Sequence, residues 1–358
     1  MSLFVDIKKK YKGFTLDIQL DLEKGVCGLL GASGCGKSMT LRCISGIEKP
    51  DSGIIVVNGK TLFDSSKHIN LPSRQRKVGL AFQHNALFPH MTVEENMLFG
   101  LPHVSRHERA LRVEESLRTM GIRELKDRYP GQLSGGQLQR IALARSLVSS
   151  PDILMLDEPF SALDAHIKSM IGHEISLILS AFPETVLYVS HDMDEVYGIC
   201  PQIAVIADGK VVECGKREDL LLHPTTLAGA RITGCKNISE TSIRDQSTVF
   251  AKKWGIALTC PKVIMQNQDV FACIRAHHVS LVSDDLLGRQ ENTFSAKILF
   301  TSETRFEYTF GCSLMTEDGT YTKEIFYWLV EKSRMEHMPL ADEKITIAIL
   351  PEDVLLVR

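Results

Sequence analysis

The chain has 358 residues, enough for two domains at a typical size of about 150 residues each. Its 41 Lys and Arg residues against 44 Asp and Glu residues leave a formal net charge of −3, which argues against a protein that coats nucleic acid or an anionic membrane. With 44% hydrophobic and 24% charged residues, it has the composition of a globular protein, which excludes a disordered chain, a collagen-like chain and a coiled-coil rod.

Membrane-spanning and secreted proteins are also disfavoured. A membrane-spanning helix needs about 18 consecutive apolar residues, whereas the longest apolar runs, such as residues 153–156, have the length of strands. The N-terminus lacks the long apolar stretch of a secretory signal. The nine cysteines include no Cys-x-x-Cys pair, which favours reduced thiols over a disulfide framework or a zinc site. We expect a cytosolic protein that does not itself cross a bilayer.

Short apolar runs alternate with helical patterns through about the first 230 residues. The runs that we predict to be strands are residues 26–30, 78–82, 153–156, 186–189 and 203–206. Because they are apolar on both faces, they fit a covered, largely parallel sheet. The clearest helical pattern follows Ser134, a candidate N-cap, and continues with Ile141 and Val148 at helical spacing before Pro151 ends it.

A glycine-rich loop follows the first predicted strand and matches the pattern G-x-x-x-x-G-K-[ST]. Small residues let successive backbone N–H groups point inward, and the helix that follows offers its positive N-terminal end to phosphate. We predict that the amides from Gly34 to Ser38 bind phosphates, that Lys37 neutralises the β and γ oxygens, and that Ser38 ligates Mg²⁺. The nucleotide-binding residues of this segment are Gly31, Ala32, Ser33, Gly34, Cys35, Gly36, Lys37, Ser38 and Met39.

Two adjacent carboxylates, Asp157 and Glu158, end the predicted strand at residues 153–156, at the edge where α/β sheets place ligand chemistry. Because alternate strand residues point to opposite sides, the two can have different roles. We assign Asp157 to the Mg²⁺ shell and Glu158 to polarising the attacking water as general base. If this pair were the only motif in the sequence, the alternative would be that Asp157 and Glu158 are ordinary acidic residues at the end of a strand.

A second phosphate-binding helix start precedes that strand. It consists of Ser134, Gly135, Gly136 and Gln137, whose serine and glycines expose amides at a helix N-terminus. The loop at residues 31–38 already saturates one nucleotide. The second site therefore makes sense if it faces the γ-phosphate held by another copy of the chain.

Beyond about residue 235 the pattern changes to short strands, with a helical suggestion only at residues 324–334. Residues 274–282 match residues 349–357 in register, at a period of 75. The repeat predicts a small β-barrel built from two related halves. We predict a nucleotide-binding domain at residues 1–235, with a helical subdomain at about 84–150, and a barrel at residues 236–358.

Taken in order, these motifs resemble the ATP-binding cassette family. The segments of this chain that resemble the family's motifs are, in chain order, the phosphate loop, Gln83 after a predicted strand, residues 133–137, the acidic pair, residues 161–164, and His191 after a predicted strand. The resemblance implies an α/β P-loop NTPase cassette with a mostly parallel sheet and with antiparallel β and helical subdomains, followed here by an all-β, OB-like barrel.

The resemblance also assigns roles to single residues. It implies that Gln83 senses Mg²⁺ and the attacking water, that Asp164 lies in a loop communicating across a dimer, and that His191 contacts the γ-phosphate. An aromatic ring should stack on adenine; Tyr11 is the candidate from its position before Lys37, with Phe14 as the alternative.

Residues 84–96 resemble the stretch by which importer-type cassettes receive a helix from a membrane subunit. Leu87, Phe88 and Met91 would suit a docking groove, or the core of the helical subdomain. The resemblance implies ATP and Mg²⁺ as cofactors and a second copy of the chain as partner in an ATP-sandwich homodimer. It further implies integral membrane permease subunits, indirectly a substrate-binding protein, no nucleic acid, and a peripheral place on the cytoplasmic face of the membrane.

Within the family, residues 59–64, 70–72, 74–79 and 234–237 look like the molybdate importer ATPases, whose tail is a TOBE/Mop-like barrel. Glu291 stands where that barrel has an arginine, and a carboxylate there would repel an oxyanion. Importers of sulfate or thiosulfate, iron or polyamines are alternatives. Cassette ATPases that act without a membrane partner are a remoter one, because they usually carry two cassettes or a long coiled-coil insertion.

Overall fold

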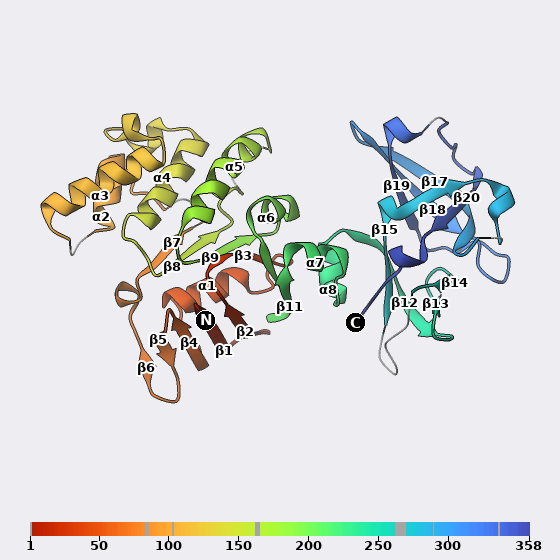
Figure 1. The fold of residues 1–358 in the computed structure, drawn as a ribbon, viewed down its shortest axis with the longest axis horizontal. Helices are drawn as coiled ribbons and strands as arrows, with labels where there is room; N and C mark the ends of the chain where they lie inside the picture. The colour runs from red at the N-terminus through yellow and green to blue at the C-terminus, as the bar shows by residue number, and fades with distance from the viewer. Residues whose placement is uncertain are drawn as a thin grey trace. The chain divides into compact units, whose positions relative to one another are not determined.

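The computed structural model describes residues 2–82, 86–101, 104–161, 165–261, 270–288, 290–335 and 337–358. The chain divides into two compact units, Met1–Arg217 and Glu218–Arg358, which follow one another along the colour ramp of Figure 1. The functional boundary that the sequence suggests at residue 235 stays a prediction. In the part of the chain described, no helix is long and apolar enough to span a membrane.

The first unit is built on a mixed sheet with the strand order β6-β5-β4-β1-β2-β11-β10-β3-β9-β8-β7. Its parallel strands are β3 (Gly25–Leu30), β7 (Val78–Ala81), β8 (Ile153–Asp157), β9 (Thr185–Ser190) and β10 (Gln202–Ala207). These are the five runs that the sequence predicts to be strands, and most of their residues are buried, as apolar residues on both faces require.

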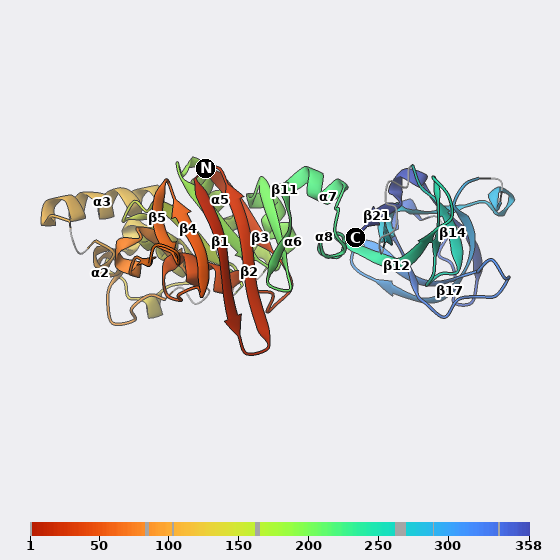
Figure 2. The same cartoon turned by 90° about the horizontal axis from the view of Figure 1, so that it is seen from below.

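A mainly antiparallel region, in which only β11 and β2 pair in parallel among the described residues, extends the same sheet. Its strands are β1 (Leu3–Tyr11), β2 (Phe14–Leu22), β4 (Ser52–Val57), β5 (Lys60–Asp64), β6 (Ile69–Asn70) and β11 (Lys210–Lys216). Figure 2 shows β5, β4, β1 and β2 side by side. Burial alternates along β1 and β2, which is the pattern of strands with one covered face.

Helices complete the first unit. They are α1 (Lys37–Ser45), α2 (Val93–Phe99), α3 (Arg106–Thr119), α4 (Gly135–Leu147), α5 (Ala165–Ala181) and α6 (Met193–Ile199). The helices α2, α3 and α4 lie together and come between β7 and β8 in the chain (Figure 1). The predicted helix is confirmed, because Ser134 is the N-cap of α4 and both Ile141 and Val148 are buried.

The short helix α7 (Arg217–Leu222) starts at the last residue of the first unit, and the second unit continues with α8 (Leu227–Ile232) and then with strands. One sheet contains β12 (Cys235–Ile243), β13 (Thr248–Ala251), β14 (Ile256–Thr259), β15 (Phe271–Arg275) and β21 (Leu355–Val357). The other contains β16 (Val279–Val282), β17 (Thr293–Glu303), β18 (Glu307–Leu314), β19 (Phe326–Glu331) and β20 (Lys344–Ile349). Both are antiparallel and share one apolar core, so the all-β prediction is confirmed.

The repeat predicted in this unit has a structural counterpart. Each copy is a strand, a 3₁₀ turn and a second strand: β15, Ala276–His278 and β16 in the first copy, and β20, Pro351–Asp353 and β21 in the second. The first strand of each copy pairs with the second strand of the other, β15 with β21 and β20 with β16. The two halves therefore complete each other's sheets.

The helix suggested at residues 324–334 is wrong. The segment forms β19 followed by a 3₁₀ turn, Lys332–Arg334. Phe326 and Trp328 are both buried in the core, while Tyr327 and Leu329 are only half-buried. This alternation has the period of a strand, and pairing with β18 satisfies the backbone groups that a helix would have satisfied internally.

Candidate nucleotide-binding site

Three neighbouring parallel strands carry the predicted motifs at their carboxyl ends. The strands β3, β9 and β8 lie next to one another in the sheet. The glycine-rich loop follows β3, His191 follows β9, and Glu158 follows β8. The strand order therefore gathers segments that lie far apart in the sequence at one edge of the sheet, the edge where open α/β sheets bind ligands.

The phosphate loop needs glycine at two positions for different reasons. Gly36 is the N-cap of α1 and has a φ of 113°, a left-handed conformation that residues with a side chain rarely adopt. A Cβ atom on Gly31 would lie 2.3 Å from the carbonyl oxygen of Ile206, so the backbone of β10 approaches too closely for any side chain. These two glycines allow the loop to turn sharply into the start of α1.

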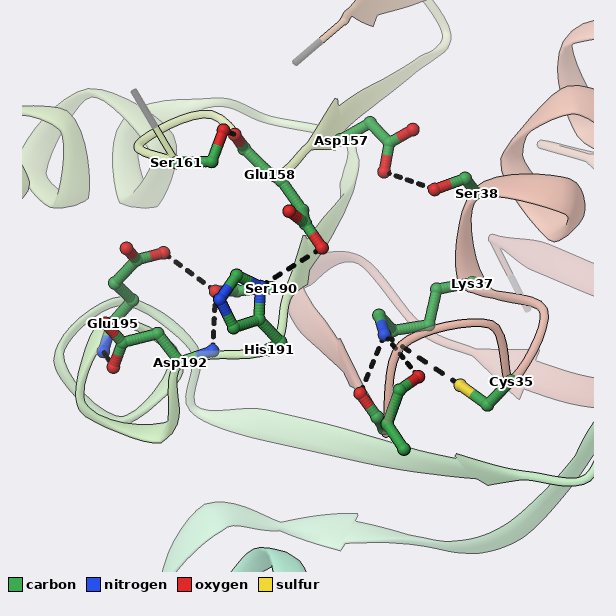
Figure 3. A network of polar contacts seen from close by, with 12 residues as sticks. Cys35, Lys37, Ser38, Asp157, Glu158, Ser161, Ser190, His191, Asp192 and Glu195 are labelled. Atoms are coloured by element: carbon green, nitrogen blue, oxygen red, sulfur yellow. Dashed lines mark hydrogen bonds and ion pairs between the residues drawn. The ribbon is translucent and has the colours of Figure 1, made fainter. Parts of the chain in front are cut away.

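Lys37 lies within the curve of this loop and is 5% exposed. Its ammonium donates hydrogen bonds to the carbonyl oxygens of Gly31, at 2.7 Å, and Ala32, at 3.0 Å (Figure 3). The loop thus holds a positive charge at its centre, at the N-terminal end of α1, where both the charge and the helix dipole favour a bound phosphate.

Ser38 and Asp157 meet across the site. The Ser38 hydroxyl donates to Asp157 Oδ1 at 2.8 Å, although the residues are 119 positions apart. Burial raises the pKa of Asp157 above its ordinary value, even though this hydrogen bond lowers it. A hydroxyl and a carboxylate are oxygen ligands of the kind that Mg²⁺ prefers, so these two residues fit the predicted metal.

The side chain of Glu158 extends toward His191, as Figure 3 shows. Glu158 Oε1 lies 3.2 Å from His191 Nδ1. Glu158 has a φ of 48°, unusual for a residue other than glycine, and its amide donates to the carbonyl of Val189 at 2.9 Å. The two adjacent carboxylates thus have different partners, Ser38 for Asp157 and His191 for Glu158.

A cavity of about 360 Å³ lies over the loop. Its lining residues come from the loop, from α1 and from the end of β8: Ser33, Gly34, Gly36, Lys37, Ser38, Met39, Arg42 and Glu158. Arg42 was not predicted from the sequence. The signal that could have found it is its position four residues after Ser38 on α1, which places the two on one helix face.

The second predicted phosphate-binding segment does not line this cavity. Ser134 caps α4 reciprocally with Gln137: its hydroxyl accepts from the Gln137 amide, and the Gln137 side chain accepts from the Ser134 amide. Ser134 and Gly135 are exposed, and Gly136 is buried. The helix start is therefore preorganised and accessible, and among the described residues the cavity is completed without it.

The remaining predicted residues are placed as follows. The Tyr11 hydroxyl donates to Glu48, and its ring centre lies 6.2 Å from that of Phe14. A Cβ atom on Gly36 would lie 3.2 Å from Phe14 Cζ, so Phe14 is the aromatic ring in contact with the loop. Neither ring is among the cavity-lining residues. Gln83 and Asp164 lie outside the described residues.

Comparison with known proteins extends this picture. The model of the ABC transporter family matches residues 15–161. The molybdenum import ATP-binding protein ModC of Rhodospirillum rubrum is 35% identical over 307 residues, which are 84% of this chain and 83% of that protein. The chain belongs to the ATP-binding subunits of importer-type ABC transporters.

Other relatives agree with this family. The Fe(3+) ions import ATP-binding protein FbpC of Haemophilus influenzae is 38% identical over 255 residues, which are 70% of this chain and 72% of that protein. The structure of cbiO1 from Clostridium perfringens, part of the ABC transporter complex cbiONQ, aligns with a TM-score of 0.54 and 32% identity, covering 61% of this chain and 89% of that one. The ABC chain described here is thus an ATP-binding ATPase subunit with the cassette fold.

Proposed function

We propose that this ABC subunit hydrolyses ATP in the cavity over the phosphate loop and couples hydrolysis to import of a small oxyanion, molybdate. The observation that carries the hydrolytic part is the grouping of the Lys37 ammonium, the Ser38–Asp157 pair and the Glu158 carboxylate at one sheet edge. Phosphoryl transfer to water needs negative charge to be neutralised and the attacking water to be aligned.

Each group has a separate part in this reaction. Ser38 and Asp157 would hold Mg²⁺, which neutralises charge on the transferred phosphate when bound. Glu158 accepts the proton of the attacking water, and His191, 3.2 Å from Glu158, contacts the γ-phosphate. Gln83 is proposed to sense Mg²⁺ and the attacking water, as the family resemblance implies.

We assign the exposed helix start at Ser134 to the active site of a second copy. In the described part of one chain, Ser134 does not line the cavity. The backbone amides that follow Ser134 are nevertheless preorganised at the N-terminus of α4. In this arrangement ATP on the loop of one copy is closed over by Ser134–Gln137 of the other, and Asp164 communicates across the interface.

A mixing experiment tests this arrangement. Lys37→Ala and Ser134→Arg chains should each be inactive alone, because each homodimer lacks one part of both sites. Mixed dimers contain one complete site, so a one-to-one mixture should recover roughly a quarter of the wild-type rate. A mixture that stays inactive would show that the site does not combine two copies.

The membrane partner is proposed to dock at a cavity of about 450 Å³ beside β7. Phe88 packs edge to face on Phe99 at 4.7 Å between ring centres, and Arg145 lies over the Phe88 ring and donates to the Ala86 carbonyl. Phe99 is 59% exposed, so an apolar surface remains for a helix of a permease subunit.

Substitution of Phe99 tests the docking proposal. Phe99→Asp should abolish co-purification with the membrane subunits while ATP binding is retained. Leu111→Asp is the matched control, because Leu111 is 58% exposed on α3 and does not line the cavity. Equal loss of co-purification in both variants would contradict docking at this place.

Molybdate is proposed as the substrate because the match to the molybdenum import protein covers 84% of this chain, whereas the match to the iron import protein covers 70% of it. The second unit gives less support for binding the oxyanion itself. The Asn292 side chain already bridges the amide and the carbonyl of Thr259, at 2.7 and 2.8 Å, and Glu291 beside it is exposed.

Uptake of labelled molybdate, tungstate and sulfate by cells lacking this gene tests the substrate. Loss of molybdate and tungstate uptake, restored by the wild-type chain and not by Glu158→Gln, is expected. Loss of sulfate uptake with molybdate uptake unchanged would favour a sulfate importer and reject molybdate. Uptake of iron and polyamines, measured in the same cells, distinguishes the remaining alternatives.

A further inference from the structure

A connected set of polar side chains lies behind His191 and is used by none of the steps above. Glu195, on α6, accepts hydrogen bonds from the Ser190 hydroxyl at 2.8 Å and the Tyr188 hydroxyl at 3.2 Å (Figure 3 shows the former). Its other oxygen lies 2.8 Å from the ammonium of Lys168. The Glu195 side chain is 9% exposed, so the carboxylate is largely withdrawn from water.

Lys168 joins this set to a different part of the chain. It lies in the first turn of α5, four residues after Asp164 in the sequence. Its ammonium is also 3.6 Å from Asp192 Oδ2, and the hydrogen bond to Glu195 raises the pKa of Lys168 above its ordinary value, so the side chain is charged. The Lys168 ammonium therefore forms ion pairs with two carboxylates, those of Glu195 and Asp192.

These contacts anchor the residues on both sides of His191. Ser190 precedes it, and its hydroxyl donates to Glu195 and accepts from the amide of Asp192 at 3.0 Å. Asp192 follows it and caps α6 through its side chain. Without the ammonium, the two carboxylates near His191 would repel each other and Glu195 would keep a charge in a largely buried place, which is costly.

We propose that Lys168 is a positioning residue for ATP hydrolysis. Through Glu195 and the two residues that flank His191, its ammonium holds the imidazole beside Glu158. The inference rests on the proposed function, since it takes His191 and Glu158 to act at the γ-phosphate.

Steady-state hydrolysis by the full chain tests the proposal with Lys168→Met and Lys168→Arg. Lys168→Met should lower kcat about 10-fold or more with KM and ATP affinity unchanged, because small misplacements at a reacting centre are costly. Lys168→Arg should recover most of kcat, since a cavity of about 440 Å³ beside Lys168 has room for the guanidinium. Lys24→Met is the matched control, because it removes another ion pair of the same unit, 2.9 Å to Glu184, and should leave kcat unchanged.

A double variant separates positioning from a structural role. Single-turnover hydrolysis detects residual activity in His191→Ala, and Lys168→Met should add no further loss to it, because the ion pair acts through the imidazole. The proposal is overturned if Lys168→Met lowers the rate of His191→Ala by the same factor by which it lowers the wild-type rate. It is also overturned if Lys168→Met alone has the wild-type kcat. If Lys168→Met does not fold, Glu195→Gln is measured instead, and wild-type kcat in that variant overturns it equally.

The outcomes also distinguish this inference from the proposed function. A His191→Ala chain that hydrolyses ATP at the wild-type rate would remove His191 from the site, and both would fail. An inactive His191→Ala beside a fully active Lys168→Met would overturn only the positioning role of Lys168.

Discussion

Strands of the two compact units of this ABC subunit are buried in two different ways, as the central parallel strands of the first and two antiparallel strands of the second show. In the first, β8, β9 and β10 are covered on both faces, and their polar chemistry begins where the strands end, as at Asp157. In the second, β14 and β19 bury alternate residues, and rings such as those of Phe310 and Trp328 fill the core, stacked at 4.6 Å between centres. In β8, β9 and β10 a residue's place along the strand decides its role, whereas in β14 and β19 the side it faces decides it.

This difference explains why function could be predicted for one unit and only fold for the other. Residues that bind phosphate or Mg²⁺ are restricted to a few chemical types at fixed spacing, and that restriction is visible in a single sequence. Residues that fill a core are restricted mainly in size and polarity, so many sequences satisfy the same barrel. Four substitutions test the comparison.

The largest effect is expected from Glu158→Gln in the first unit. Removing the general base should lower turnover by about 10²–10⁴-fold while ATP binding is retained, because the phosphate loop is untouched. Steady-state hydrolysis and equilibrium nucleotide binding measure the two effects separately. Glu184→Gln, which alters a carboxylate paired with Lys24, is the control and should hydrolyse ATP normally. Normal turnover in Glu158→Gln would reject its assignment as the base.

A core substitution in the second unit should act on stability alone. Phe310 is fully buried, and Phe310→Ala should lower the free energy of unfolding of this unit by about 3–5 kcal/mol while ATP affinity stays unchanged. Denaturant unfolding followed by tryptophan fluorescence reports on it, because Trp254 and Trp328 both lie in this core. Phe306→Ala, at a site 72% exposed, should change stability by less than about 0.5 kcal/mol. A fall in ATP affinity in Phe310→Ala would show that the units are not separable.

Arg76 is a buried residue of the first unit to which the sequence assigned no role. It is 1% exposed and donates to the carbonyls of Cys43 and Ile44 at the end of α1, and to the Leu71 carbonyl. Arg76→Met should destabilise the first unit by about 2–4 kcal/mol, because buried carbonyl groups lose their donors.

Thermal unfolding with and without ATP measures this effect. The control is Arg74→Met, since Arg74 is exposed two residues earlier and its loss should be nearly neutral. If Arg76→Met unfolds like the wild type, water replaces the guanidinium at the end of α1, and the site's helix does not depend on it.

The smallest effect concerns the adenine base. Tyr11→Ala should weaken ATP binding by about 1–3 kcal/mol if its ring stacks on adenine. The affinities of Tyr11→Ala and Phe14→Ala for ATP and for GTP are measured and compared with those of the wild-type chain. Loss of affinity in Phe14→Ala with Tyr11→Ala unchanged would transfer the role to Phe14, the ring that already contacts Gly36.

Much of the fold follows from local sequence patterns. The buried strands of the first unit and the helix capped by Ser134 are each specified by neighbouring residues, whose spacing shows the period of a strand or a helix. The repeat in the second unit is visible as two similar segments 75 residues apart. The helix suggested at residues 324–334 shows the limit of such patterns. Phe326 and Trp328 belong to a strand because β18 and the core lie beside them, which nearby sequence cannot reveal.

The chemistry proposed for the phosphate loop and for the acidic pair can be predicted from the amino-acid sequence, because contiguous residues of restricted type carry both. Only the tertiary structure decided which distant groups meet: Ser38 with Asp157, and Glu158 with His191. It also showed Lys168 behind the imidazole. The physical reason is that strand order in the sheet depends on packing between residues more than a hundred positions apart, and that packing leaves no mark on local spacing.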